Sequence, residues 1–460
     1  MNPILSFVER IAIGAEVDEI ERPLIDFRND HTLSQRDLCK SVLIMASPDS
    51  GKTTLARTLY RGMLRRHYGG LVLCVKQSQI DEFLSSARLE EREDDCIVVT
   101  AGGLHTFNPL AHENNVNEAA ALIGELTEVV ADKIRGGDND SFWKSQLLII
   151  LRNLFALCEL AYGKFDVVKA AELFDGRANS STEIFDPTWQ ETSSLAIALR
   201  MAKKCMDDVN IGLAVEYFER TFPSHGDRLQ GSLAATVSSV LDYLRRPPLR
   251  ALFAGESTFA MEDLLNGGKI CIVGLPVLDS VDGKIANALL QFCFCRAASR
   301  PGRKNFAFLI SDECQETVSS ELASKLAVLR ESKIATILLT QNLAVLDQKI
   351  GLTARQSLCA LLETKIFGGQ NHAETRQWAA EQIGKRKVPV ETKTTGSNSG
   401  ERGSGRNASK SVGEQWDYRV PPLRFAELEV GETICLRREE VWRARWHKDK
   451  PGKCGTVRIV

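Results

Sequence analysis

Short apolar runs recur in the first quarter of the chain and again in its second half. Most of them are separated by stretches in which apolar residues are three and four positions apart. The runs cover residues 41–45, 71–75, 96–100, 269–275, 306–311, 334–340 and 364–368. Apolar runs of this length are typical of strands buried on both faces, and the helical spacing between them is typical of a parallel sheet covered by helices. The pattern therefore predicts an α/β fold with a mainly parallel sheet.

The middle of the chain has a different pattern, in which almost every segment has helical periodicity. These segments cover residues 119–134, 141–162, 167–174, 193–209 and 229–244. Asp140 and Ser141 are suitable residues to cap the second helix, and Pro247 with Pro248 marks the end of the helical stretch. We predict that residues 1–111 and 251–460 form two parts of one α/β domain, and that residues 112–250 form a large all-helical insertion.

Glycine and serine dominate residues 392–413, where Arg402, Arg406 and Lys410 are scattered. Such a segment buries little apolar surface, so the sequence predicts a mobile loop, with a basic loop that orders on contact with DNA as the alternative. Residues 431–436 and 441–446 then predict a terminal hairpin. We interpret Trp442 and Trp446 as core or interface residues rather than as a platform for stacking bases.

Composition narrows the class of protein. The chain has 460 residues and 43% hydrophobic content, enough for a large core, and its 58 basic and 60 acidic residues nearly cancel. This balance excludes a globally basic coat for nucleic acid, while a local basic surface or a ring of several subunits stays open. The 12 cysteines include no Cys-x-x-Cys pair, so we predict buried, reduced thiols in a reducing compartment.

The apolar run 41–45 ends in a glycine-containing motif followed at once by helical spacing. Its residues are Ala46, Ser47, Pro48, Asp49, Ser50, Gly51, Lys52, Thr53 and Thr54. A tight turn before a helix aims main-chain N–H groups at phosphates, Lys52 would reach the β- and γ-phosphates, and Thr53 would hold Mg²⁺. The motif therefore predicts a P-loop that binds ATP with Mg²⁺. Ala46 stands where the usual motif has glycine, so we expect slightly weaker affinity.

Two later runs end in residues suited to the same chemistry. Residues 306–311 precede Asp312 and Glu313, which we predict to hold Mg²⁺ and to orient the attacking water, respectively. Residues 334–340 precede Gln341, whose amide can sense the γ-phosphate from a strand beside the P-loop. Arg330 lies between these runs, and by itself it is typical of a solvated helix face.

Taken together, these motifs resemble the cytosolic ATPase of type IV coupling proteins, the TraG/TraD-like motors of conjugation and type IV secretion within the FtsK–HerA class. The resemblance also includes residues 107–110 (Phe-Asn-Pro-Leu), residues 140–143 (Asp-Ser-Phe-Trp) and the Gly/Ser-rich segment. It implies a RecA-like P-loop ATPase domain with an all-helical domain, assembled as a hexameric ring that moves DNA. It also implies that Arg330 enters the ATP site of the neighbouring subunit as an arginine finger.

Members of that family usually begin with two transmembrane helices, and this sequence shows no apolar run of about 18 residues. We therefore expect a cytoplasmic protein, with recruitment to the inner membrane by a partner as an option. Expected partners are DNA, bound without sequence preference, further copies of the chain, and a relaxase, nuclease or secretion-channel protein. The alternatives are a HerA-like ATPase of phage defence or DNA processing, and an ATP-dependent protein assembly switch. The missing Leu-Ser-Gly-Gly-Gln motif argues against an ABC-type transport ATPase.

Overall fold

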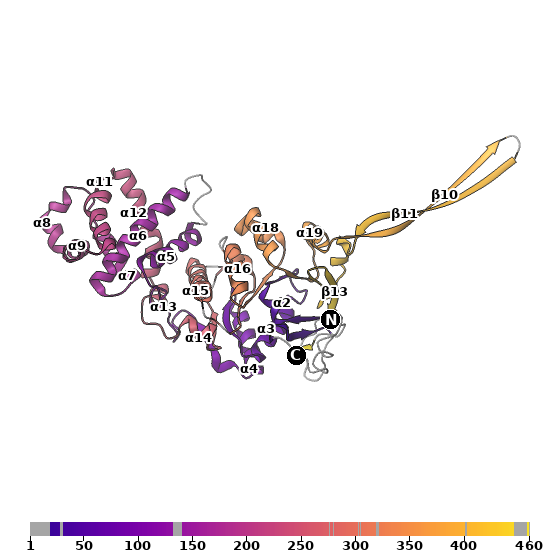
Figure 1. Ribbon diagram of the computed structural model, residues 1–460, viewed down its shortest axis with the longest axis horizontal. Coiled ribbons are helices and arrows are strands. Elements are labelled where there is room, and N and C mark those ends of the chain that lie inside the picture. Colours follow the sequence, from indigo (N-terminus) through magenta and orange to yellow (C-terminus); the bar gives the residue numbers. More distant parts are fainter. Residues whose placement is uncertain are drawn as a thin grey trace. The chain divides into compact units, whose positions relative to one another are not determined.

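The structure is a computed structural model that describes residues 19–27, 31–131, 140–275, 277–278, 280–301, 303, 305–318, 322–400, 403–445 and 458–459 (Figure 1). The chain divides into two compact units. Residues 1–62 and 337–460 form the first unit, and residues 63–336 form the second. The first unit is therefore made from both ends of the chain.

The central strand of the first unit is β3 (Val42–Met45), which is buried along its whole length. It pairs in parallel with β8 (Ile334–Thr340) and β9 (Thr364–Phe367), so that Met45 lies opposite Thr340 and Phe367. The sheet continues from β9 through two antiparallel strands, β12 (Glu432–Arg437) and β13 (Glu440–Arg445). The predicted terminal hairpin is thus confirmed, and it extends the sheet that carries β3.

Trp442 on β13 is a core residue, as predicted. It is 5% exposed, and its ring lies 5.3 Å from that of Phe27 and 4.7 Å from that of His31, measured between centroids. A small antiparallel sheet is made of β1 (Pro23–Asp26), β2 (Thr32–Ser34) and β14 (Arg458–Ile459). Phe27 directly follows β1, and His31 directly precedes β2. Trp446, the other predicted core tryptophan, lies outside the described residues.

Helices complete the first unit. They are α2 (Gln35–Cys39), α3 (Lys52–Arg65), α17 (Leu343–Ile350), α18 (Leu352–Leu361) and α19 (Ala373–Ile383). Capping residues define where several begin. The Ser34 hydroxyl accepts from the Asp37 N–H at the start of α2, and the Asn342 side chain accepts from the Val345 N–H at the start of α17.

The second unit contains a four-strand parallel arrangement in the order β7–β4–β6–β5. The strands are β7 (Ala307–Ser311), β4 (Gly69–Leu73), β6 (Ile270–Val273) and β5 (Cys96–Val99). Helices α4 (Gln77–Leu89), α14 (Met261–Leu265), α15 (Val281–Ser299) and α16 (Leu322–Glu331) belong to the same unit. Residues on nearly every side of α15 are buried, which explains its apolar sequence.

The segment between β5 and β6 is the one in which the sequence predicts the all-helical insertion. All of its described residues are helical or irregular. The helices are α5 (Val116–Ala131), α6 (Asp140–Tyr162), α7 (Val167–Asp175), α8 (Pro187–Thr192), α9 (Ser194–Ala202), α10 (Val209–Glu216), α11 (Phe222–Ser224), α12 (Asp227–Arg245) and α13 (Leu249–Phe253). The predicted single helix over 193–209 is interrupted between α9 and α10, where Asp208 caps the new helix. The domain boundaries at residues 112 and 250 stay a prediction.

The two ends of this helical stretch are held together. The Phe107 ring stacks on Phe259 at 5.2 Å, and the Phe107 N–H donates to the Leu252 carbonyl at 2.8 Å. The Asn108 side chain accepts from the Leu110 N–H at 3.0 Å, which shapes the turn into the helices. The Asn-Pro-Leu stretch therefore anchors the chain where it leaves the strands, beside the segment by which it returns.

One described helix, residues 142–162 of α6, is long and apolar enough to cross a membrane, with a mean hydropathy of 1.3. Its side chains Leu147, Ile150, Leu154 and Phe155 are buried, and α6 packs against α5, α7, α9, α10 and α12. The helix is therefore the core of the helical stretch, and core helices meet the same criterion of length and composition.

The structure differs from the sequence-based expectation over residues 392–413. Instead of a loop, this segment is part of a long antiparallel ribbon of β10 (Lys385–Gly400) and β11 (Gly403–Tyr418), drawn in Figure 1. Main-chain groups of glycine and serine pair as well as those of any other residue, so a ribbon can form without an apolar core. Ion pairs of Lys387 with Glu414, at 2.8 Å, and of Lys410 with Glu391, at 2.6 Å, bridge the two strands.

Candidate functional site

The P-loop segment leaves the carboxyl end of β3 between the ends of its two parallel neighbours. The Ala46 N–H donates to the Thr340 carbonyl at 3.3 Å, and the Gly368 N–H donates to the Met45 carbonyl at 3.0 Å. The Ser47 N–H then donates to the Gly369 carbonyl at 2.8 Å. The last residue of β8 and the residues that follow β9 therefore fix the start of the loop.

The loop turns tightly before α3. Asp49 and Gly51 have positive φ values of 61° and 91°, and the Ser50 hydroxyl donates to the Ser47 carbonyl at 2.5 Å. The Leu55 N–H donates to the Gly51 carbonyl at 3.1 Å, so the helical hydrogen bonds start at Gly51. This conformation places the first main-chain N–H groups of α3 at the mouth of the turn, where an anion is favoured.

Gly51 is required for a second reason besides its positive φ. A Cβ atom there would lie 3.1 Å from the Gly431 main-chain nitrogen, which itself donates to the Ser50 carbonyl at 3.0 Å. The segment that leads into β12 is thus packed directly on the loop. A residue larger than glycine at position 51 would both strain the backbone and displace this segment.

Ala46 is accommodated by Gly368. A Cβ atom at position 368 would lie 2.8 Å from the Ala46 Cβ, a distance that two carbon atoms do not adopt without displacement. Ala46 is 2% exposed, so its methyl group packs against the end of β9. The usual P-loop motif has glycine at position 46 and needs no such space. Here the missing side chain of Gly368 leaves the space that the Ala46 methyl group fills.

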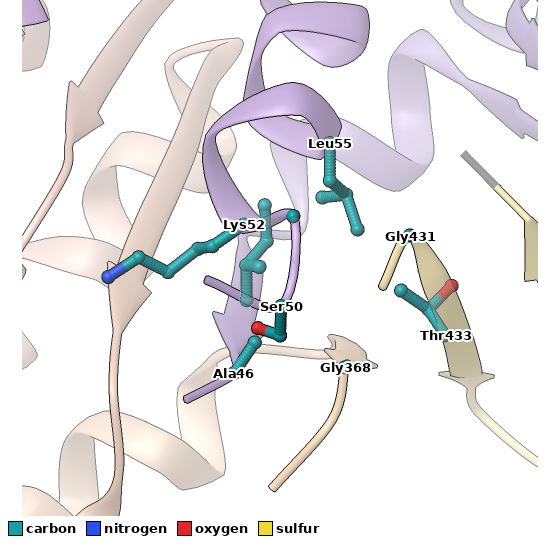
Figure 2. A pocket seen from close by; sticks show the side chains of 9 residues that line it. Ala46, Ser50, Lys52, Leu55, Gly368, Gly431 and Thr433 are labelled. Atoms are coloured by element: carbon teal, nitrogen blue, oxygen red, sulfur yellow. The ribbon is translucent and has the colours of Figure 1, made fainter. Parts of the chain in front are cut away.

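Lys52, Thr53 and Thr54 open α3 and are partly exposed. Figure 2 shows the Lys52 side chain extending away from Gly431 and Thr433. Those two residues belong to a small pocket beside the loop, which is lined by Ile44, Ala46, Ser50, Gly51, Lys52, Leu55, Gly368, Gly431 and Thr433. The Lys52 ammonium and the pocket therefore lie on different sides of the loop.

Gln341 directly follows β8 and thus lies beside the P-loop, as the sequence predicts. Its main-chain carbonyl accepts from the side-chain amide of Gln370 at 2.8 Å. Gln370 and Gly368 belong to a Gly-Gly-Gln stretch at the end of β9 that sequence reasoning missed. The available signal was two glycines and an amide directly after an apolar run.

Asp312 and Glu313 follow β7 in the second unit. The Asp312 side chain accepts from the Glu313 N–H at 2.9 Å, and Glu313 has a left-handed φ of 57°. The Gln315 side chain donates to the Glu313 carboxylate at 2.8 Å. These two bonds restrain both carboxylates within one tight turn. The left-handed backbone of a non-glycine residue, as at Glu313, occurs often at functional positions.

Cys74 follows β4, the strand next to β7, and Leu73 lies opposite Ser311 in that pair. Burial, and to a smaller extent the nearby negative charge of Asp312, raise the pKa of the Cys74 thiol to about 12. Cys74 is therefore a neutral thiol at physiological pH and contributes packing rather than nucleophilic chemistry.

Arg330 is exposed in the last turn of α16. The Lys333 N–H donates to the Arg330 carbonyl at 3.3 Å, and the Ala307 N–H at the start of β7 donates to the Lys333 carbonyl at 3.3 Å. Arg330 thus lies near the amino end of β7, whereas Asp312 follows its carboxyl end, about 15 Å away along a five-residue strand. The structure does not bring Arg330 to the acidic pair of its own chain.

Each unit therefore assembles part of the predicted site. The first brings residues 46–54 and Gln341 to the ends of adjacent parallel strands, and the second holds Asp312 and Glu313 at the end of β7. Among the described residues, no group of three or more His, Cys, Asp or Glu side chains is arranged to hold a metal ion by itself.

Comparisons with known proteins agree with the fold. Residues 307–418 match a family model described as the TraM recognition site of TraD and TraG. The chain is similar in structure to the bacterial conjugative coupling protein TrwBΔN70 in its unbound form, with a TM-score of 0.64 and 14% identity over 98% of this chain and 94% of that one. The plasmid coupling protein TrwB in complex with ADP and Mg²⁺ gives a TM-score of 0.65, also at 14% identity, with the same coverage.

VirB4 of Thermoanaerobacter pseudethanolicus is also similar, with a TM-score of 0.52 and 12% identity over 95% of this chain and 94% of that one. No curated protein matches the sequence. The predicted RecA-like P-loop fold with its mainly parallel sheet is confirmed, and so is the resemblance to type IV coupling proteins.

We predict that Gly368→Ala destabilises the first unit by about 1–3 kcal/mol, because the new methyl group meets Ala46 in a packed interior. Adding Ala46→Gly should restore stability, since it removes the opposing methyl group. Denaturant unfolding and nucleotide affinity measure both effects. Gly413→Ala is the matched control, because no atom lies within 4 Å of a Cβ at that position. A double variant no more stable than Gly368→Ala alone would contradict the packing argument.

Proposed function

We propose that this chain is an ATP-driven motor that moves DNA, of the kind that type IV coupling proteins represent. The observation that carries the proposal is the P-loop of residues 46–54 at the end of β3, flanked by Gln341, within a fold shared with TrwB. TrwB has been seen with ADP and Mg²⁺ and with a non-hydrolysable ATP analogue. A P-loop in the same fold supports nucleotide binding by this chain.

The residues present fit Mg²⁺-ATP. The turn at Asp49 and Gly51 and the start of α3 offer main-chain N–H groups and a helix dipole to phosphates, and Lys52 adds a positive charge. Thr53 and Asp312 carry the hard oxygen atoms that Mg²⁺ prefers, and we propose them as its protein ligands. When bound, Mg²⁺ would neutralise part of the negative charge on the phosphates.

The remaining roles follow from position and chemistry. Glu313 is proposed to accept a proton from the attacking water and to orient it, because its carboxylate is fixed in direction by the turn and by Gln315. Gln341 is proposed to contact the γ-phosphate from the strand beside the P-loop. Phosphoryl transfer depends on such positioning and on charge compensation more than on covalent chemistry.

We further propose that the chain works as a ring in which each ATP site needs a group from the neighbouring subunit. Arg330 is exposed and lies near the amino end of β7, away from Asp312, and this position supports a role at a site on another subunit. The match of residues 307–418 to a TraM recognition model supports a protein partner that binds this part of the chain. We propose a hexamer that receives DNA from such a partner.

The proposal is tested by the ATPase rate with and without double-stranded DNA, together with the mass of the assembly. We expect DNA to raise the rate, and Lys52→Ala to lower it at least about 100-fold, because lost charge compensation at the transition state costs several kcal/mol. Lys164→Ala, which removes a lysine whose side chain is 61% exposed, is the control. A rate that DNA leaves unchanged would favour a protein assembly switch.

Asp312 and Glu313 should give different defects. Glu313→Gln is expected to bind ATP normally and to hydrolyse it at least about 100-fold more slowly, because the amide cannot accept the proton from water. Asp312→Ala is expected to weaken binding of Mg²⁺-ATP itself. Equilibrium binding of a fluorescent ATP analogue, with and without Mg²⁺, separates the two. Equal binding defects in both variants would refute this division of roles.

Arg330→Ala should bind ATP normally but hydrolyse it poorly, because an arginine finger acts only as the transition state forms. In a shared site, Lys52→Ala and Arg330→Ala subunits mixed in equal amounts should recover activity, since some interfaces then carry both native groups. Lys52→Ala mixed with a chain carrying both substitutions is the control, because no interface is then complete. Mixed rings without recovery would show that Arg330 does not act between subunits.

A further inference from the structure

The segment that follows β9 contacts both the P-loop and the turn after β8. At its centre lies Gln370, which is 3% exposed although its side chain is polar. The side-chain oxygen of Gln370 accepts from the Ser47 hydroxyl at 3.1 Å and from the His372 N–H at 3.0 Å. Its side-chain nitrogen donates to the Gln341 carbonyl at 2.8 Å. One buried amide therefore joins the P-loop to the residue after β8.

Further hydrogen bonds from the same segment hold both partners of Gln370. The Asn371 N–H donates to the Ser47 hydroxyl at 2.9 Å, which orients that hydroxyl toward Gln370. On the other side, the Thr375 hydroxyl accepts from the Leu343 N–H at 3.1 Å. Thr375 is 1% exposed and is itself bonded to the His372 ring at 2.9 Å. Residues 341–343 are thus held at both ends.

We propose that Gln370 is a positioning residue, which sets Gln341 against the P-loop so that the Gln341 amide meets the γ-phosphate during hydrolysis. This inference rests on the proposed ATPase function. Ser47 and Gln341 are 294 residues apart in sequence, and the Gln370 side chain bonds to both. If the Gln370 side chain is removed, the P-loop keeps its main-chain bond from Ser47 to Gly369, while the Gln341 carbonyl loses a donor.

The chemistry of the contacts explains why glutamine stands here. A primary amide donates and accepts at the same time, and position 370 requires both. A glutamate carboxylate could accept from Ser47 and His372 but could not donate to the Gln341 carbonyl. An asparagine side chain is shorter by one methylene group. Each lost bond would leave a buried polar group unsatisfied, which costs more than the bond itself contributes.

The two contacts of Gln370 predict two separable kinetic effects. The bond to Ser47 supports the loop that holds the nucleotide, so its loss should raise KM. The bond to Gln341 fixes a residue that acts on the γ-phosphate, and a displacement of about 1 Å at such a position lowers the rate on the order of 100-fold. A purely structural residue would instead lower the folded fraction and leave the kcat of folded molecules unchanged.

The test is a double-mutant cycle in the full-length chain, with kcat and KM measured for wild type, Gln370→Met, Gln341→Ala and the double variant. Methionine is similar to glutamine in length but does not donate from its end. We expect Gln370→Met to lower kcat about 10- to 100-fold in the wild-type background and less than about 3-fold once Gln341 is alanine, because coupled residues are not additive. Ser47→Ala, which removes the bonds of the Ser47 hydroxyl to Gln370 and to the Asn371 N–H but leaves the bond between Gln370 and Gln341, should raise KM with a smaller change in kcat.

Gln377→Met is the matched control, since Gln377 lies on α19 and bonds at the surface to Glu381 and to the Tyr418 hydroxyl. It should leave both constants unchanged. An equal loss of kcat for Gln370→Met in both backgrounds would overturn the inference, and so would a wild-type kcat for Gln341→Ala, because Gln370 would then have nothing to act through.

Amide hydrogen exchange separates this inference from the proposed function. Gln370→Met should speed exchange at His372 and Leu343 at least about 3-fold, because the bonds that protect these amides depend on the segment around Gln370. If the wild-type chain hydrolyses no ATP, the proposed function fails while faster exchange still supports the linkage. Unchanged exchange at both amides would overturn the linkage whatever the ATPase result.

Discussion

The parallel pairing of β3 with β8 and β9 is the constraint on which the nucleotide site depends. Because the carboxyl ends of parallel strands meet at one edge of a sheet, this register brings three chain segments together: the P-loop after Met45, Gln341 after Thr340, and Gly368 after Phe367. Each neighbour then bonds to the first residues of the loop. The geometry of the loop is therefore a property of three strands and not of the motif alone.

Close approach at this edge is made possible by missing side chains. Gly368 leaves room for the Ala46 methyl group, and Gly51 leaves room for the main chain at Gly431. A buried polar side chain also contributes: the Gln370 amide bonds to Ser47, His372 and Gln341 within the interior. The result is a rigid support, and such a support favours a site that must hold groups in place while charge develops on a phosphate.

Ion pairs connect helices within the second unit. Arg296 on α15 lies 3.6 Å from Glu125 on α5, and Glu125 also pairs at 2.9 Å with Lys325 on α16, the helix that carries Arg330. Arg296 also bonds to Glu113 at 3.1 Å, in the segment that leads into α5. These groups are partly buried, so their interactions are screened less than those of surface pairs. The helical stretch and the helix of the proposed arginine finger are thus physically connected.

The sequence by itself determined strands β3 to β9, the terminal hairpin, the P-loop segment, the position of the helical stretch and the acidic pair at the end of β7. Each of these depends on local spacing: apolar runs, helical periodicity and turn residues at strand ends. It did not indicate β1 or β2, which are short. It did not determine the ribbon of β10 and β11, whose pairing lies in main-chain groups that composition does not reveal. Only the tertiary structure showed that Gly368 compensates for Ala46 and that Gln370 joins Ser47 to Gln341. The physical reason is distance along the chain, since Ser47 and Gln370 are 323 residues apart and the bond between them exists only once the parallel strands have brought their ends together.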